Sequence, residues 1–162
     1  MKVLLVDDEP FILQGLSVLI DWAAEGCEIV KMASNGKEAL LYLEDHEADL
    51  VITDIKMPVM SGLELLEQIR GRQISDAFFI ILSGYNDFSY AQKAIRYACM
   101  DYLVKPVQKE ALLELIRKAK SSLAVTEQNA ENERRMQEMQ LKQYIIALLR
   151  GKQNEEELKY VK

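Results

Sequence analysis

The chain has 162 residues, of which 49% are apolar and 28% charged, and its formal net charge is −6. This length allows one ordinary domain with an appendage, and the composition is that of a globular protein with a sizeable core. The acidic excess lies within residues 1–123, because acidic and basic residues cancel after that point. A negatively charged domain is repelled by a phosphate backbone, so direct nucleic-acid binding by this chain is not expected.

The sequence gives no signal for a membrane span or for secretion. No apolar run approaches the roughly 18 residues that predict a span. The apolar run at the start meets Asp7 and Asp8 at once, which excludes a signal-peptide core. Cys27 and Cys99 lack the spacing of metal ligands, and two reduced thiols are expected. We therefore predict a cytoplasmic protein without membrane contact.

Segments typical of strands and of helices alternate along residues 1–123. Short apolar runs predict strands at residues 2–6, 28–33, 50–53, 78–82 and 102–104. Apolar residues with helical spacing predict helices over about 11–23, through 39–43, through 63–69, over 88–97 and from about 109. This alternation predicts a parallel sheet with helices on both faces. The right-handed crossover rule favours a five-stranded doubly wound sheet of the flavodoxin-like order 2-1-3-4-5.

The residues after position 123 predict a long C-terminal helical extension. No Gly or Pro interrupts residues 107–150, and an apolar stripe that weakens after Leu123 returns between Met136 and Leu149. We expect residues 124–150 to be a helical linker and a candidate coiled coil. Gly151 is expected to end the helix. Residues 151–162 have the composition of the cap and first turn of a following element, which the sequence cuts short.

Polar residues stand at the carboxyl ends of four predicted strands. In a sheet of order 2-1-3-4-5, ligands bind where the strand order reverses, between the first and third strands. Asp7 and Asp8 follow the first strand, and Asp54 follows the third. The fourth and fifth strands end near Ser83 and Lys105. These five side chains are therefore predicted to converge on one rim of the sheet.

The chemistry of these five side chains favours a metal-assisted reaction at phosphorus. Three crowded carboxylates raise one another's pKa values unless a cation neutralises them. A hard oxygen site with few carboxylates and room for waters suits Mg²⁺. An aspartate can attack phosphorus to form an acyl phosphate, which requires mainly positioning and charge neutralisation. Mg²⁺ and Lys105 would neutralise the phosphoryl oxygens, and the Ser83 hydroxyl would donate a hydrogen bond to one of them.

Four segments resemble the receiver domains of bacterial two-component response regulators. They are LVDDEP at 5–10, TDIKMPVMSG at 53–62, LSG at 82–84 and DYLVKP at 101–106. The resemblance covers about residues 1–123, with the motifs in the family's order and spacing. It implies that Asp54 accepts a phosphoryl group from a sensor histidine kinase. It also implies that Mg²⁺ is bound directly by Asp8, Asp54 and the Lys56 backbone carbonyl, and by Asp7 through a water.

The same resemblance implies a conformational switch. Ser83 and Tyr102 match the family's switch pair, in which the hydroxyl swings to the phosphoryl group and the aromatic ring turns inward. A homodimer is expected through the face formed by the fourth helix, fifth strand and fifth helix, or through the C-terminal helix. The Lys105-Pro106 bond is a candidate cis peptide, as is frequent in the family.

Three further phrases are similar to response regulators that carry an AraC-type DNA-binding module. These are IDW at 20–22, ASNGKEAL at 33–40 and SGYNDFSYA at 83–91. The similarity implies that the parent is a transcription factor and that this chain is its input half. DNA would then be contacted only by an output domain that this chain lacks.

Two other functions fit parts of the same pattern. An aspartyl-nucleophile phosphatase usually carries a second Asp two residues after the nucleophile, a position that Lys56 occupies here. A receiver-like binding module would take no phosphoryl group, although all five site residues are present. The interpretation we favour is a signalling phosphoacceptor that is not a turnover enzyme but assists its own phosphotransfer and dephosphorylation.

Overall fold

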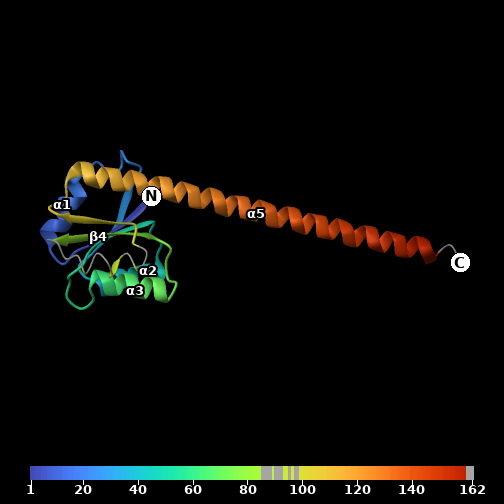
Figure 1. The fold of residues 1–162 in the computed structure, drawn as a ribbon, viewed down its shortest axis with the longest axis horizontal. Helices are drawn as coiled ribbons and strands as arrows, with labels where there is room; N and C mark the ends of the chain where they lie inside the picture. Colours follow the sequence, from blue (N-terminus) through green and yellow to red (C-terminus); the bar gives the residue numbers. More distant parts are fainter. Residues whose placement is uncertain (85–88, 90–92, 95, 97–98, 160–162) are drawn as a thin grey trace. The chain divides into compact units, whose positions relative to one another are not determined.

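The computed structural model describes residues 1–84, 89, 93, 94, 96 and 99–159, with residues 151–159 described by their backbone alone. The chain divides into two compact units, Met1–Ser121 and Ser122–Lys162. The first unit is an α/β domain, whose sheet and helices can be followed in Figure 1. The last helix, α5 (Lys109–Lys159), begins in the first unit and forms the described part of the second.

Five strands form a single sheet in the order β2-β1-β3-β4-β5. Their bounds are β1 (Lys2–Val6), β2 (Glu28–Ala33), β3 (Leu50–Asp54), β4 (Phe78–Gly84) and β5 (Asp101–Lys105). All four pairings are parallel, and the register places Val6 beside Thr53 and Asp54 beside Leu82. The predicted fold class and strand order are confirmed, with small differences at the strand ends.

Helices cover both faces of the sheet, and the described residues form two large apolar cores and one small apolar cluster. Alternate strand residues, such as Leu5, pack with α1 (Pro10–Leu19) and the beginning of α5. The intervening residues, such as Leu4, pack with α2 (Gly36–Asp45) and α3 (Gly62–Gly71). Strands buried on both faces must be apolar at nearly every position, which explains the unbroken runs in β1, β3 and β4. Each fully buried Leu or Ile contributes roughly 1.5–3 kcal/mol.

Two predicted helix ends differ from those in the structure. Helix α1 ends at Leu19 and not near residue 23, because Ile20 is extended at φ −130° and ψ 162° and packs into the core. Gly151 does not end α5, which continues to Lys159. A lone glycine costs a helix only about 1 kcal/mol relative to alanine, and no proline follows it. The helix predicted over residues 88–97 lies mostly outside the described residues.

The extension contains no candidate membrane span: within the described residues, every helix is either too short or too polar to cross a bilayer. The coiled coil over residues 124–150, and a further element over 151–162, stay predictions.

The Lys105-Pro106 peptide is cis, as the resemblance to receiver domains implied.

The loop between β3 and α3 contains a valine in a conformation that valine rarely adopts. Val59 has a φ of 69°, and 79% of its surface is exposed. A β-branched residue is disfavoured in this left-handed region, because its Cβ crowds the following carbonyl. The folded state therefore holds local strain that the exposed side chain does little to offset.

Replacing this valine by glycine is predicted to stabilise the domain. Val59→Gly removes the strain but adds freedom to the unfolded chain, so we expect the free energy of unfolding to rise by about 0.5–1 kcal/mol. Val18→Gly is a matched control, because Val18 is equally exposed (79%) but lies inside α1. That control should lose about 0.5 kcal/mol. Urea unfolding measures both, and destabilisation by Val59→Gly would contradict the assignment of strain.

Candidate functional site

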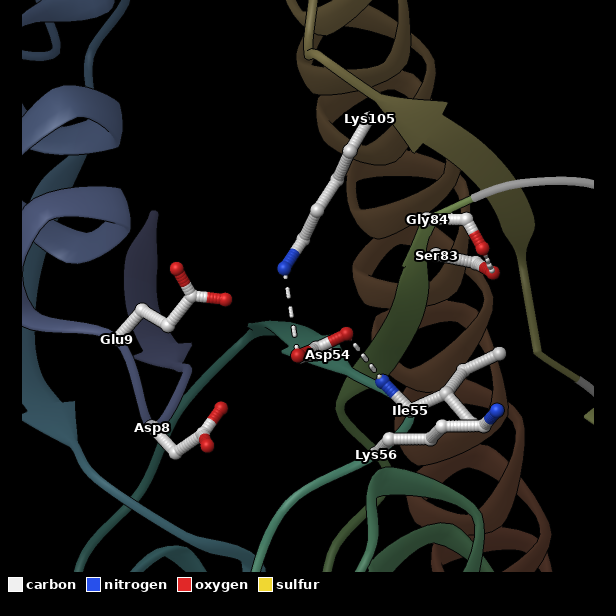
Figure 2. A pocket seen from close by; sticks show the side chains of 8 residues that line it. All are labelled: Asp8, Glu9, Asp54, Ile55, Lys56, Ser83, Gly84 and Lys105. Carbon is white, nitrogen blue, oxygen red and sulfur yellow. Dashed lines mark hydrogen bonds and ion pairs between the residues drawn. The ribbon is translucent and has the colours of Figure 1, made fainter.

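A polar pocket opens at the carboxyl ends of the strands. Asp7 follows β1, Asp54 is the last residue of β3, and Lys105 is the last residue of β5. The pocket has a volume of about 280 Å³ and is shown in Figure 2. Its lining residues are Asp8, Glu9, Asp54, Ile55, Lys56, Ser83, Gly84 and Lys105. The strand register thus brings the residues predicted from the sequence to one rim.

Three carboxylates lie close enough to share one ion. One carboxylate oxygen each from Asp7, Asp8 and Asp54 lies within 4.8 Å of the others. Asp7 is fully buried and Asp54 is 8% exposed, whereas Asp8 is exposed at the pocket mouth. Hard oxygen donors with one open side are the donor set that Mg²⁺ prefers, because this ion keeps several of its waters. The residues present therefore fit a hydrated magnesium ion.

Lys105 joins two of these carboxylates. Its Nζ lies 2.9 Å from Asp7 Oδ2 and 3.3 Å from Asp54 Oδ2. Burial lowers the pKa of Lys105, but the hydrogen bond that Lys105 donates to Asp7 and the charge of Asp54 outweigh burial and leave the pKa raised. The lysine is therefore a fixed cation, and Figure 2 shows it reaching across the pocket to Asp54.

Asp54 has an unfavourable environment for its charge. Burial raises the pKa of the Asp54 carboxyl, and the nearby charge of Asp7 raises it further. Lys105 opposes this rise, as does the Ile55 amide, which donates to Asp54 Oδ1 at 2.8 Å. An additional cation beside Asp54 would therefore stabilise the ionised form of its carboxyl group.

The two predicted switch residues lie on neighbouring strands. Ser83 is buried, and its hydroxyl donates to the Gly84 carbonyl at 3.1 Å, so that it points away from Asp54 (Figure 2). Tyr102 packs against a small cluster that contains Ile55, the residue after Asp54. The Tyr102 hydroxyl is buried without a hydrogen-bond partner among the described residues. The serine must therefore rotate before it can face Asp54, whereas the tyrosine ring is already partly inside.

Two contributors to the site, Glu9 and Gly62, were not predicted from the sequence. Glu9 lines the pocket beside Asp8, and its position directly after the acidic pair could have indicated this. Gly62 lies so close to the backbone of Asp54 that a Cβ would be 2.0 Å from the Asp54 carbonyl oxygen. Its amide donates to the Ile55 carbonyl at 2.8 Å. Gly62 ends the receiver-like segment at 53–62, but the sequence does not reveal its contact with Asp54, because that contact is set by the returning loop.

A doubly wound α/β domain that holds three carboxylates and a lysine at its switch point belongs to the class that can bind a cation together with an anionic group. Residues 3–117 match the model of the response regulator receiver domain. The chain belongs to this family, in agreement with the resemblance found in its sequence.

Curated relatives include transcriptional regulators. The chain is 39% identical over 112 residues to the uncharacterised transcriptional regulatory protein YesN of Bacillus subtilis, covering 69% of this chain and 30% of that protein. It is 42% identical over 115 residues to the transcriptional regulatory protein HptR of Staphylococcus aureus, covering 71% and 44%. The chain thus spans less than half the length of these relatives.

Solved structures agree with the fold. The receiver domain of AraT, a response regulator from Geobacillus stearothermophilus, is 39% identical, with a TM-score of 0.72, and the match covers 78% of this chain and 97% of that one. The CheX–CheY–BeF₃–Mg²⁺ complex from Borrelia burgdorferi matches at 28% identity with a TM-score of 0.64, covering 70% and 84%.

The raised pKa of Asp54 predicts how stability depends on pH. Folding disfavours the ionised form, so this cost is absent below the ordinary pKa of 3.8 and develops as the pH rises through the pKa of the folded state. Asp54→Asn should therefore unfold at higher urea concentration than the native chain at pH 7 without divalent ions. The gain should disappear on acidification toward pH 4.

The matched control for this measurement is Glu47→Gln, which removes an exposed carboxylate outside the site. It should change stability little, and equally at each pH. A stabilisation by Asp54→Asn that does not depend on pH would show that ionisation is not its cause.

Proposed function

We propose that this chain is a phosphoacceptor that takes a phosphoryl group on Asp54 from a sensor histidine kinase in the presence of Mg²⁺. The observation that carries the proposal is the position of the Lys105 ammonium, 2.9 Å from Asp7 and 3.3 Å from Asp54, beside three clustered carboxylates. A cation beside a poorly solvated carboxylate suits the transfer of an anionic group. Membership of the receiver family supports this proposal.

The contacts of Asp54 suit a direct transfer of the phosphoryl group from the kinase histidine to its carboxylate. A carboxylate oxygen of Asp54 attacks phosphorus, an O–P bond forms, and the N–P bond to the kinase histidine breaks. The electron pair of the broken bond returns to the histidine nitrogen, which takes up a proton. The Ile55 amide holds Asp54 Oδ1 at 2.8 Å and so fixes the direction of attack. Lys105 is near enough to follow the negative charge onto the phosphoryl oxygens.

The proposed metal site uses the acidic cluster. Asp8, Asp54 and the Lys56 backbone carbonyl would hold Mg²⁺, with Asp7 acting through a water. The bound ion would supply charge neutralisation for the phosphoryl oxygens. The CheX–CheY–BeF₃–Mg²⁺ complex from Borrelia burgdorferi, which contains a related domain, supports this proposal.

The proposed output is a change of conformation and not the turnover of a substrate. The Ser83 hydroxyl exchanges the Gly84 carbonyl for a phosphoryl oxygen, and Tyr102 moves with it. Relatives that are more than twice as long as the matched segment are named as transcriptional regulators. This supports an output domain elsewhere in the parent protein, of the AraC type if the sequence similarity holds, through which DNA would be contacted.

Phosphorylation can be tested directly by mass spectrometry. With acetyl phosphate and Mg²⁺, the native chain should gain the mass of one phosphoryl group, and Asp54→Asn should gain none. Asp8→Asn should require at least about 10-fold more Mg²⁺, because it removes the negative charge of a proposed direct ligand. Glu47→Gln again serves as the matched exposed control. A phosphoryl group on Asp54→Asn, or an unmodified native chain, would refute the assignment.

We also propose that the distal part of α5 pairs with a second copy of the chain. Exposed apolar side chains are concentrated over residues 136–149, where Leu141, Ile145 and Leu148 recur with the spacing of one helix face. We call the face formed by Leu141, Tyr144, Ile145 and Leu148 the distal apolar face. Met136, Met139, Ile146 and Leu149 are further exposed apolar residues of the same segment. The alternative dimer face includes the fourth helix, which lies mostly outside the described residues.

Sedimentation with the acyl-phosphate analogue BeF₃⁻ tests this pairing. BeF₃⁻ with Mg²⁺ should increase self-association of the native chain. Ile145→Glu should reduce self-association at least 10-fold, because pairing would bury the added charge. Gln143→Glu adds the same charge on the opposite side of the helix and should leave self-association unchanged. No response to BeF₃⁻, or equal effects of the two variants, would count against the distal apolar face.

A further inference from the structure

We propose that Gly36, at the start of α2, is a positioning residue for the loop over residues 55–61 and thereby sets the affinity of the site for Mg²⁺. The inference rests on the proposed function, because it concerns the ion that assists phosphorylation. Gly36 is distant from Asp54 in the sequence and does not line the pocket. Its influence would pass through the backbone of the loop.

The contact between Gly36 and the loop leaves no room for a side chain. The Gly36 amide donates to the Met60 carbonyl at 3.0 Å. A Cβ at position 36 would lie 2.7 Å from that carbonyl oxygen and 2.9 Å from Met60 Cγ. The nearer of these atoms belongs to the backbone, so alanine at position 36 would push the loop itself and not only a flexible side chain.

The helix start that carries this amide is held firmly. The Asn35 side chain accepts from the Glu38 amide at 2.9 Å, and Glu38 accepts from the Ser34 amide at 3.1 Å and from the Ser34 hydroxyl at 2.7 Å. These reciprocal bonds form a capping arrangement that fixes the first turn of α2. A crowded contact at Gly36 is therefore relieved more easily by movement of the loop than by movement of α2.

The loop passes directly from this contact to the pocket. It is closed at its base by the Gly62 amide, which donates to the Ile55 carbonyl at 2.8 Å. Ile55 and Lys56 line the pocket, and the Lys56 carbonyl is the proposed backbone ligand of Mg²⁺. Between the base and Met60 lies the strained Val59. The bond from Gly36 to Met60 thus fixes the far side of a short loop whose near side faces the ion.

Small displacements of this loop are expected to change the affinity for Mg²⁺, because the ion tolerates little deviation in its coordination geometry. The ion requires near-ideal octahedral geometry with ligand distances of about 2.0–2.1 Å. Groups that orient direct ligands typically change metal affinity by about 10- to 100-fold when they are altered. A shift of a few tenths of an ångström at Met60 would therefore weaken binding of the ion without removing any ligand.

Substitution of Gly36 separates affinity from chemistry. Phosphorylation by acetyl phosphate is followed by mass spectrometry over a range of Mg²⁺ concentrations. Gly36→Ala should raise the half-saturating Mg²⁺ concentration by about 10-fold or more, with little change in the rate at saturating Mg²⁺. A general loss of structure would instead lower the saturating rate. Gly15→Ala is the matched control, because Gly15 is an exposed helical glycine with nothing within 4 Å of its Cβ position.

Amide hydrogen exchange tests the same coupling in the native chain, whether or not Gly36→Ala folds. Coupling is reciprocal: if the bond from Gly36 to Met60 favours Mg²⁺, then Mg²⁺ must protect the Gly36 amide. Exchange at Gly36 should slow at least severalfold when Mg²⁺ is added, while exchange at Gly15 stays unchanged. Unchanged exchange at Gly36, or an unchanged Mg²⁺ requirement in a folded Gly36→Ala, would overturn the inference. Failure of the native chain to accept a phosphoryl group would instead overturn the proposed function.

Discussion

The interaction on which the site depends is that of one ammonium group with two carboxylates that face each other across the ends of β1 and β3. Asp7 is fully buried and Asp54 is only 8% exposed, so bulk water stabilises both charges poorly. Lys105 is the last residue of β5, which is separated from β3 by β4, and its ammonium group contacts both carboxylates. Its single charge cannot neutralise three carboxylates, and burial, together with the charge of Asp7, keeps the pKa of Asp54 raised despite Lys105. The site therefore carries an excess of negative charge, which suits a divalent cation.

Close backbone packing supplies the precision that electrostatics alone would not. Gly62 approaches the Asp54 carbonyl, and Gly36 approaches the Met60 carbonyl, each at a distance that excludes a side chain. The loop that carries Lys56 is thus held between two glycines from different helices. An acidic rim on a flexible loop would attract cations without fixing their coordination, and these contacts limit that freedom.

Most of the fold could be predicted from the sequence, because its local signals agree with one another. The unbroken apolar runs gave the buried strands, and the acidic and basic residues at their ends gave the rim. The contributions of Gly36 and Gly62 could not be predicted, since they depend on contacts between elements that pattern and spacing do not encode. The end of α1 was placed too late because Ile20 continues the helical spacing, and only tertiary packing draws it out of the helix. The helix end predicted at Gly151 was wrong, because a single glycine disfavours a helix only weakly and α5 continues through it.

The Tyr102 hydroxyl, buried without a partner among the described residues, has a consequence for energetics. An unsatisfied polar group of this kind costs a protein roughly 1–3 kcal/mol. This penalty raises the free energy of the resting arrangement relative to any other in which the phenol reaches water or an acceptor. The two conformations of the proposed switch need differ by only a few kcal/mol, so a penalty of this size would be a sizeable share of that difference. If the proposal holds, the unsatisfied hydroxyl would bring the resting conformation closer in free energy to the alternative one.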